Sequence, residues 1–524
     1  MKKLYIALSM NLLCCVSCLD EHPRDRISPE QAFDTPTHIY LNTVGTLYSL
    51  MGSDADSQGL QGTYRGIYDY NTFTTDEAII PRRGGDWYDG GFWERLYTQQ
   101  WRSHDSELYA TWSYLYKVVV LSNDAIRTLN TYRSRLTAEQ HRAYTAEARA
   151  IRAMYYYYLV DMFGNVPLLD KPEVKVSDVK KAKRSDVFLF AFNELQAVCD
   201  DLPDARSNAE GLYYGRITRP VVYFLLAKLA LNAEVYTCNH PAKEPRRSGS
   251  AIYFTVDGTQ MNAWQTVIHY CDQITAAGYR LETDYAANFA IHNETSQENI
   301  FTLPMDKNLY TTQYQYLFRS RNYHHGRALG LGAENGACAT ISTVKAFGYG
   351  TPNVDTRYAL NFYSDTITVD GDTVRLDNGQ PLVYQPLAVA LDLTYSKEMK
   401  TAGARMKKYE IDRKAYLVGK LQDNDIVLYR YADVLLMLAE AKVRNGESGD
   451  DALTAVRHRV GMPPRAATLD NILEERLLEL VWEGWRRQDL IRFNRFNKSI
   501  SGSSTDKSLF PIPQNAIDLN PNLR

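Results

Sequence analysis

The stretch EERLLELVWEGWRRQDLIRF, Glu474 to Phe493, combines a leucine stripe with a dense row of charges near the end of this chain. Apolar residues recur there at helical spacing and can form one buried stripe: Leu473, Leu477, Leu480, Val481 and Leu490. The pattern predicts one helix over roughly Asn471 to Phe496.

The same stretch repeats opposite charges three or four positions apart, at Glu479, Glu483, Arg486, Arg487 and Asp489. Residues at that spacing are neighbours on a helix surface, so ion pairs along the helix are geometrically available. We interpret these charges as a structural set that holds the fold together, and not as catalytic carboxylates.

Outward from this stretch, apolar periods of 3.6 residues predict further helices. Their expected ranges are His38 to Met51, Leu108 to Asn130, Ala148 to Met162 with a stop at Phe163-Gly164, Arg184 to Asp201, Thr218 to Tyr236, Ala263 to Ala277, Ile426 to Arg444 and Asp450 to Val460. The long helices fall into pairs joined by short turns, which is typical of a tetratricopeptide-like solenoid, although a clean repeat period is not visible. The expected fold class is mainly α.

Between Leu281 and Asp425 helical periods become rare, and Gly, Asn, Asp, Thr and Tyr become frequent. The alternating run Thr366 to Val369 predicts a strand, and Asp370-Gly371 predicts a hairpin turn. We expect a single domain over residues 37–524, with a helical scaffold at about 37–280 and 426–524 and an irregular, partly β insertion at about 281–425. Long ordered loops usually carry function. This one holds a group of aromatic and basic residues: Tyr310, Tyr314, Tyr316, Phe318, Tyr323, Arg319, Arg321, His324 and His325.

A second unusual stretch, TDEAIIPRRGGDWYDGGFWERLYTQQW, Thr75 to Trp101, places aromatic and charged residues among glycines. The glycines predict loop rather than helix, and no period defines a buried face for the rings. Flat rings beside fixed carboxylates and guanidiniums suit a sugar, because a ring face covers the C–H side of a pyranose while charged groups bond to hydroxyl pairs. A loop pinned to its own domain by tryptophans is an equally good interpretation.

Composition favours a soluble globular protein, with 45% hydrophobic residues and a net charge of -3. Nothing is basic enough to form a nucleic-acid surface, so no nucleic-acid partner is expected. The 38 tyrosines fit packing between helices and wet contact surfaces.

Four cysteines outside the leader form no C-x-x-C pair, which argues against a zinc site and gives no disulfide framework: Cys199, Cys238, Cys271 and Cys338.

Residues 1–17 are typical of a secretory leader, because Lys2 and Lys3 precede an apolar run from Leu4 to Leu13 that is too short to span a bilayer. Cys18 follows directly and resembles the lipidated cysteine of a bacterial lipoprotein, whose acyl chains give stable anchoring. Residues 18–36 would then be an extended, lipidated tether. The alternative is an ordinary secreted protein with a chance cysteine at this position.

Four segments resemble the SusD/RagB family of Bacteroidetes outer-membrane lipoproteins. The charged stretch Glu474 to Phe493 resembles the family's C-terminal signature, and LYRYADVLLMLAEAKVRNG, Leu428 to Gly446, resembles the helix before it. EARAIRAMYYYYLVDMFGNVPLL, Glu147 to Leu169, is similar to an earlier signature helix, and LFPIPQNAIDLNPNL, Leu509 to Leu523, to the closing segment.

This resemblance implies a surface lipoprotein that binds glycans without cleaving them and has tetratricopeptide-like helix pairs beneath a ligand-binding insertion. It also implies a place on the outer face of the outer membrane and a partner, a SusC-like TonB-dependent transporter that imports the captured oligosaccharide. Six ligand-contacting residues are carried over: Trp87, Trp93, Arg82, Asp86, Tyr310 and Tyr314. Peptide binding, or a role mainly as a mechanical lid, is the alternative that the sequence leaves open.

The sequence does not favour an enzyme. It contains no H-E-x-x-H, G-x-S-x-G or P-loop motif. Asp76-Glu77 is the most tempting carboxylate pair for glycoside hydrolysis, but adjacent residues seldom face each other across a bond, so we interpret the pair as a loop anchor. His324-His325 lacks a third metal ligand at useful spacing, and we interpret both as surface histidines. No cofactor is expected.

Overall fold

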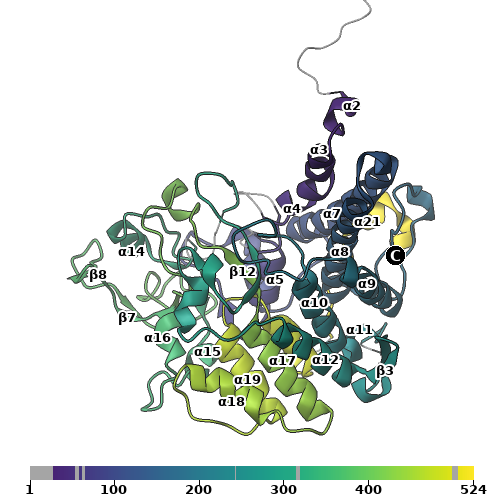
Figure 1. Ribbon diagram of the computed structural model, residues 1–524. Helices are drawn as coiled ribbons and strands as arrows, with labels where there is room; N and C mark the ends of the chain where they lie inside the picture. The colour runs from purple at the N-terminus through teal and green to yellow at the C-terminus, as the bar shows by residue number, and fades with distance from the viewer. Residues whose placement is uncertain (1–27, 53–57, 62–64, 242, 314–318, 499–505) are drawn as a thin grey trace, which may run out of the picture.

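Two long helices form the side of the molecule that carries the chain's C-terminus in Figure 1. The computed structural model describes residues 28–52, 58–61, 65–241, 243–313, 319–498 and 506–524. Helix α7 (Ser106–Thr131) packs against α8 (Ala138–Phe163), and α9 (Arg184–Val198) packs on the other side of α8. Helix α8 begins with a capping box between Thr137 and Gln140 and ends at Gly164, whose φ is 73°.

A second group of helices continues this layer. Helix α10 (Arg219–Leu231) leads into α11 (Ala233–Tyr236) and packs against α12 (Ala263–Ala276). Helix α12 in turn packs against α17 (Tyr431–Arg444), although the whole insertion separates these two helices in the sequence. Helix α17 contacts α18 (Asp450–Arg459) and α19 (Leu469–Leu480). The expectation of a mainly α protein built from helix pairs is confirmed.

The N-terminal segment is more helical than the sequence analysis expected. An extended tether was predicted up to residue 36, but α2 (Pro29–Ala32) forms a helical turn, because Ser28 and Gln31 make a capping box around it. The first helix, predicted over His38 to Met51, consists of α3 (Pro36–Tyr40), a π-helical turn at Leu41–Gly45 and α4 (Thr46–Ser49).

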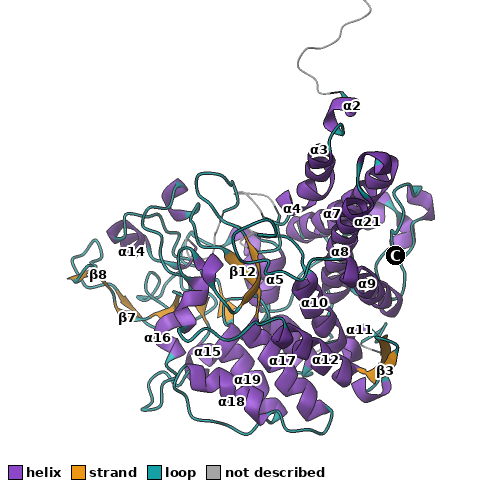
Figure 2. Cartoon of the chain, in the orientation of Figure 1, coloured by secondary structure: helices purple, strands orange, loops and turns teal. Residues whose placement is uncertain are grey.

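The insertion contains most of the strands, which Figure 2 shows on the side away from α9. The strands form short antiparallel pairs, namely β1 (Ala78–Ile79) with β5 (Cys338–Ala339), β4 (Asn299–Leu303) with β12 (Ile426–Arg430), β6 (Phe362–Tyr363) with β11 (Arg405–Met406), β7 (Asp365–Thr366) with β10 (Val383–Tyr384) and β8 (Thr368–Val369) with β9 (Asp372–Thr373). A further hairpin, β2 (Tyr253–Val256) with β3 (Thr259–Asn262), precedes α12. The predicted hairpin turn at Asp370-Gly371 is confirmed, with both residues at positive φ.

Further short helices lie along the chain. They are α5 (Ile67–Thr72), α6 (Phe92–Tyr97), α14 (Tyr323–Ala328), α15 (Ile341–Ala346), α16 (Arg357–Asn361) and α21 (Gln514–Leu519). Within the residues that the structure describes, no helix has the length and apolar character needed to cross a bilayer.

The continuous helix predicted over Asn471 to Phe496 is wrong. Helix α19 ends at Leu480, and α20 (Arg486–Arg492) starts after a five-residue break, 481–485. In the break, Trp482 and Gly484 have φ values of 68° and 76°, which are incompatible with a right-handed helix. The break turns the carboxylate of Glu483 into the interior, where Arg430 bonds to it from β12 at 2.7 Å.

The charges of this stretch hold the fold together, as expected, but many of their partners come from other elements. Glu479 accepts from Arg357 on α16 and Arg430 on β12, at 2.8 and 2.6 Å, and from Arg459 on α18. All four side chains are buried. An ion pair along one helix also exists, between Asp489 and Arg492 on α20 at 2.8 Å. The charged stretch therefore joins the insertion to the helical scaffold.

Candidate ligand-binding surface

The glycine loop, residues 82–91, makes a tight turn that presents its middle residues to solvent. Arg83 and Asp86 exchange backbone hydrogen bonds at 3.0 and 3.1 Å, which closes the turn. The backbone then takes positive φ at Trp87, Asp89, Gly90 and Gly91. Such a conformation is costly for a residue with a side chain, so the surroundings of Trp87 and Asp89 must fix it.

Arg83 fixes the loop from below. Its guanidinium is buried and donates to the carbonyl oxygens of Met399 at 2.7 Å, Ala402 at 2.9 Å and Gly336 at 3.3 Å. These acceptors belong to two segments of the insertion, so one side chain ties the loop to both. Burial lowers the pKa of Arg83 to about 9, which leaves the guanidinium charged at neutral pH.

The two tryptophans predicted to contact ligand are packed against the protein. Trp93 is 1% exposed and lies edge-on to Phe92 and Trp87, while its Nε1 donates to Asp89 at 2.7 Å. Trp87 is half-buried, and its Nε1 donates to the Glu334 carbonyl at 2.9 Å. An indole enclosed like that of Trp93 offers no ring face to a sugar in this conformation. This arrangement matches the alternative interpretation, in which tryptophans pin the loop.

Other residues of the loop face solvent. Tyr88 is 49% exposed, and the Arg82 guanidinium lies over its ring at 4.8 Å from the centroid. Asp86 is exposed and accepts a hydrogen bond at 3.1 Å from the hydroxyl of Tyr323, the first residue of α14, which is 41% exposed. These four residues bring two rings, one carboxylate and one guanidinium together, and we call them the Tyr88 surface. Arg82 and Asp86 were predicted site residues.

The electrostatics of the Tyr88 surface favour hydrogen bonding over proton transfer. Partial burial and the nearby Asp86 carboxylate raise the pKa of Tyr323 to about 12, so its hydroxyl stays protonated and donates. Asp392, at the edge of the surface, lies 3.7 Å from Arg82. Backbone hydrogen bonds between Arg82 and the 391–393 segment hold that segment beside the loop.

The remaining predicted site residues lie elsewhere or cannot be placed. Tyr310 is 44% exposed, and its segment is fixed by contacts of Met305 to Asp425 and of Lys307 to Asp423. Tyr314 lies outside the described residues, as does the predicted lipidation site, Cys18. The structure therefore brings Arg82, Asp86 and Trp87 together with Trp93, while Tyr310 lies on a segment anchored at Asp423 and Asp425.

Sequence reasoning did not single out Tyr88 and Tyr323 as site residues. Both occur in the aromatic groups described above, but an irregular loop has no period that tells an outward ring from an inward one. The position of Trp87 does depend on a glycine, because Gly336 leaves room for the indole: a Cβ on Gly336 would lie 2.5 Å from Cε2 of Trp87. The sequence alone does not show that Gly336 lies beside Trp87.

The two pairs considered for catalysis have structural positions. Asp76 forms a bidentate ion pair with Arg486, at 2.7 and 2.8 Å, and Glu77 accepts from the Trp482 backbone N–H at 2.9 Å. The interpretation of this pair as a loop anchor is confirmed. The interpretation of both histidines as surface residues is wrong for His325, which is 1% exposed because it packs against Tyr363 and Tyr384. Among the described residues, no group of three potential ligands is placed to hold a metal ion.

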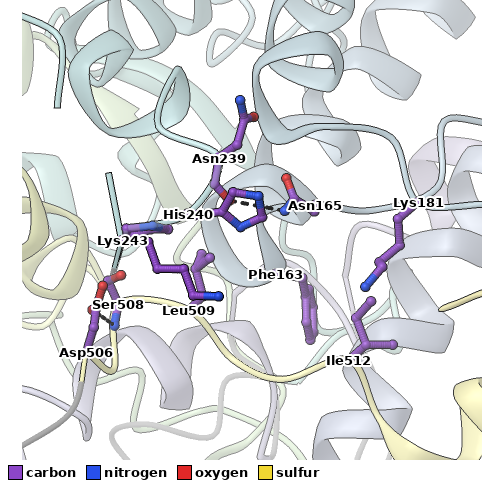
Figure 3. A pocket seen from close by; sticks show the side chains of 11 residues that line it. Phe163, Asn165, Lys181, Asn239, His240, Lys243, Asp506, Ser508, Leu509 and Ile512 are labelled. Atoms are coloured by element: carbon purple, nitrogen blue, oxygen red, sulfur yellow. Dashed lines mark hydrogen bonds between the residues drawn. The ribbon is translucent and has the colours of Figure 1, made fainter. Parts of the chain in front are cut away.

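Cavities elsewhere in the molecule have a different character. An apolar groove of about 540 Å³ runs beside α7 and α21 and is lined mainly by side chains such as Trp112, Val120 and Leu519. A pocket of about 310 Å³ with both polar and apolar walls, shown in Figure 3, lies at the end of α8. The groove offers few partners for a hydroxyl-rich molecule, whereas the Tyr88 surface offers both ring faces and charged hydrogen-bonding groups.

A scaffold of helix pairs that carries an exposed loop surface of rings and charges is typical of a ligand-binding protein. Comparison with known proteins agrees with this class. The sequence model of the SusD family matches residues 297–524, and a second model, described as starch-binding and associating with the outer membrane, matches residues 60–231. The chain belongs to the SusD family.

Relatives cover almost the whole chain. The starch-binding protein SusD of Bacteroides thetaiotaomicron is 23% identical, and the alignment covers 99% of this chain and 96% of that protein. A SusD-like carbohydrate-binding protein from Bacteroides fragilis has a similar structure, with a TM-score of 0.71, 20% identity and coverage of 94% of this chain and 99% of the other. Surface glycan-binding protein A from Bacteroides thetaiotaomicron, solved with laminarihexaose, gives a TM-score of 0.70 at 21% identity, covering 92% and 97%. The predicted SusD-like fold is confirmed.

Proposed function

We propose that this protein binds oligosaccharides at the Tyr88 surface and does not cleave them. The observation that carries the proposal is the exposed juxtaposition of Tyr88, Tyr323, Arg82 and Asp86 on a loop fixed from below. Support also comes from relatives whose names describe starch or glycan binding. The carboxylate pair Asp76-Glu77 is committed to contacts with α20 and the break, which is consistent with binding without hydrolysis.

The chemistry of the surface suits a pyranose. An exposed phenol ring covers the apolar C–H face of the sugar, and each such ring contributes about 1 kcal/mol beyond the area that it buries. The Asp86 carboxylate accepts from a hydroxyl pair, and the Arg82 guanidinium donates to neighbouring oxygens through charge-assisted hydrogen bonds. Because few rings are involved, affinity for a single sugar is modest and increases as a chain covers more of the surface.

In this proposal Trp87 and Trp93 support binding indirectly, because they hold the loop in its conformation. Trp93 holds Asp89, which also pairs with Arg65 at 2.9 Å, and Trp87 holds the loop against Glu334. Replacing either tryptophan with alanine should weaken binding together with the loop's stability. Replacing Tyr88 with alanine should weaken binding while the fold stays intact, because that ring is not packed in the core.

Isothermal titration against a panel of plant, host and fungal glycans tests the proposal. Tyr88→Ala should weaken the binding of any glycan that binds the wild type by about five- to tenfold, the loss expected for one stacked ring. Tyr253→Ala is the matched control, because Tyr253 is 59% exposed on β2. Strand β2 pairs with β3, which lies at the opposite side of the molecule from α14 (Figure 1). Equal affinity of Tyr88→Ala and wild type would show that the binding site lies elsewhere. Binding of peptides but of no glycan would favour the alternative ligand class.

The rest of the proposed function concerns location and partner. We propose that Cys18 is lipidated, that the protein sits on the outer face of the outer membrane, and that it delivers bound oligosaccharide to a SusC-like TonB-dependent transporter. Support comes from the leader sequence, the family, and the description of a matching family model as associating with the outer membrane. Purification of the tagged protein from native membranes should recover a large β-barrel protein in stoichiometric amounts. Recovery of the tagged protein alone would contradict the partner.

A further inference from the structure

The pocket in Figure 3 lies on the helical side of the molecule, where four segments of the chain meet. They are the end of α8, the segment before α9, the loop after α11 and the segment before α21. Phe163, Leu509 and Ile512 give the pocket apolar walls, and polar side chains surround the remainder. Its volume of about 310 Å³ is at the lower end of the range for small-molecule sites.

The wall formed by two asparagines is rigid. Asn165 donates to the Asn239 carbonyl at 3.1 Å, and its own side-chain oxygen accepts from the Arg184 N–H at 2.7 Å. The side-chain oxygen of Asn239 accepts from the Ser185 N–H at 3.0 Å. Both asparagines thereby cap the first turn of α9, a 15-residue helix whose N-terminal end contributes positive potential at the pocket. The pocket is thus built by hydrogen bonds that do not depend on a ligand.

Positive charge gathers around this wall. Lys181 and Lys243 approach from opposite sides, and the His240 ring lies between them (Figure 3). Within the described residues, neither lysine has a carboxylate within ion-pair distance. Beneath the pocket, the buried Arg184 donates to the carbonyl oxygens of Val160 and Val235. Unneutralised ammonium groups that converge on a cavity attract an anion.

One carboxylate, Asp506, also lines the pocket, on the same side as Lys243 (Figure 3). It accepts from the Ser508 N–H at 2.8 Å and from Asn497 at 3.3 Å. Burial alone would raise the pKa of Asp506, but these hydrogen bonds outweigh it and lower the pKa, so the group is ionised at neutral pH. The pocket therefore combines the positive charges of the two lysines with one hydroxyl-accepting carboxylate, that of Asp506.

We propose that this pocket binds a small oxyanion, phosphate or sulfate, either free or carried by a single sugar residue. The lysines and His240 contact the oxyanion, Asp506 accepts from a hydroxyl, and the apolar wall of Phe163 and Ile512 contacts the carbon skeleton. The site is separate from the Tyr88 surface, which lies near α14 on the other side of the molecule (Figure 1). The anion-site proposal is therefore independent of the proposed glycan site, and each can be tested without the other.

The test is isothermal titration of the whole protein with sodium phosphate, sodium sulfate, glucose 6-phosphate and glucose, in a chloride buffer at pH 7. The anions should bind and glucose should not. The double variant Lys181→Gln, Lys243→Gln should weaken anion binding by about tenfold or more, since it removes two charge-assisted contacts. Lys175→Gln is the matched control, because Lys175 is an exposed lysine of the same region that does not line the pocket.

A third variant changes the affinity in the other direction. Asp506→Asn keeps an acceptor for the Ser508 N–H but removes the repulsion, so it should tighten phosphate and sulfate binding. Tighter binding of glucose 6-phosphate than of phosphate would identify the anion as carried by a sugar, and the reverse order would identify a free anion. Equal binding of glucose and glucose 6-phosphate, no anion binding at millimolar concentration, or equal losses in the double variant and Lys175→Gln would overturn the proposal.

Discussion

Glu479 accepts hydrogen bonds from three buried arginines that belong to three other elements, α16, β12 and α18. Burial alone would raise the pKa of this carboxylate, but Arg459, Arg430 and Arg357 outweigh burial and hold it well below the usual range. A buried charge with several partners is costly to break, because each partner is left without its counter-charge.

Glu479→Gln should therefore destabilise the protein strongly. Removing the negative charge leaves three buried guanidiniums partly uncompensated, and the expected loss is about 3–5 kcal/mol in the free energy of unfolding. The measurement is guanidinium chloride unfolding followed by tryptophan fluorescence.

Glu474→Gln is the control for this substitution. Glu474 pairs with Arg465 at 3.1 Å on the surface, where its side chain is partly exposed, so a loss below about 1 kcal/mol is expected. Similar losses for the two variants would show that the buried cluster does not carry the stability assigned to it.

At the scale of elements, the break between α19 and α20 depends on a glycine. Gly484 has a φ of 76°, and a Cβ there would lie 3.2 Å from Cδ2 of Tyr68. Gly484→Ala should cost about 1–2 kcal/mol for the left-handed backbone and more for the contact with Tyr68.

Gly461→Ala isolates the first of these costs. Gly461 has a φ of 71°, and a Cβ added there would meet no atom of a described, non-adjacent residue within 4 Å, so the substitution has the backbone cost alone. Thermal unfolding of both variants is the measurement. A Gly484→Ala protein as stable as Gly461→Ala would mean that Tyr68 moves aside without loss.

The contact between Glu77 and this break is sensitive to pH. Burial raises the pKa of Glu77 to about 8, although the Trp482 N–H and the nearby cations Arg486 and Lys408 oppose the shift. Between about pH 4.5 and 8 the folded protein thus binds more protons at Glu77 than the unfolded chain does. By linkage, this group makes stability fall as the pH rises through that interval.

Glu77→Gln removes this titration and keeps an oxygen that accepts from the Trp482 N–H. The variant should therefore lose less stability than the wild type between pH 5 and pH 8, by about 1–3 kcal/mol. Denaturant unfolding at the two pH values measures the change in the free energy of unfolding for each protein. The contributions of the other titrating groups cancel when the change in the variant is compared with that in the wild type. Parallel pH dependence of the two proteins would show that Glu77 is ionised across the whole range.

Elements with a long apolar period could be predicted, while those set by tertiary contacts could not. The ranges of α7, α12 and α18 agree with the sequence prediction, because each has one continuous buried face. The break at 481–485 was missed, since Leu480, Val481 and Leu490 continue the helical stripe across it. The positive φ of Trp482 has no sequence signal, and it is fixed by Glu77 and the surrounding core.

For the whole molecule, the signature segments predicted the fold better than any periodicity. Neighbouring helices α12 and α17 lie on either side of the insertion in sequence, so their packing could be expected only from the family resemblance. The candidate site was predicted in part. Arg82 and Asp86 lie on the Tyr88 surface, but the direction of each ring depends on anchors such as Arg83 and Gly336 that distant segments supply.

Anchoring of the whole protein to a membrane is a prediction from the sequence. Cys18→Ser should abolish incorporation of labelled palmitate and move the protein from the membrane fraction to the soluble fraction, because acylation supplies the membrane affinity. Cys199→Ser is the control, since this cysteine is buried in the turn that follows α9 and is far along the chain from the leader. Membrane association that survives Cys18→Ser would contradict lipidation at this residue.

The ion pair between Asp76 and Arg486 joins residues that are 410 positions apart. During synthesis the ribosome must release nearly the entire polypeptide before that link can close, and closing so long a loop is entropically demanding. A nascent or C-terminally truncated product therefore lacks the ion pair that anchors the segment leading into the glycine loop.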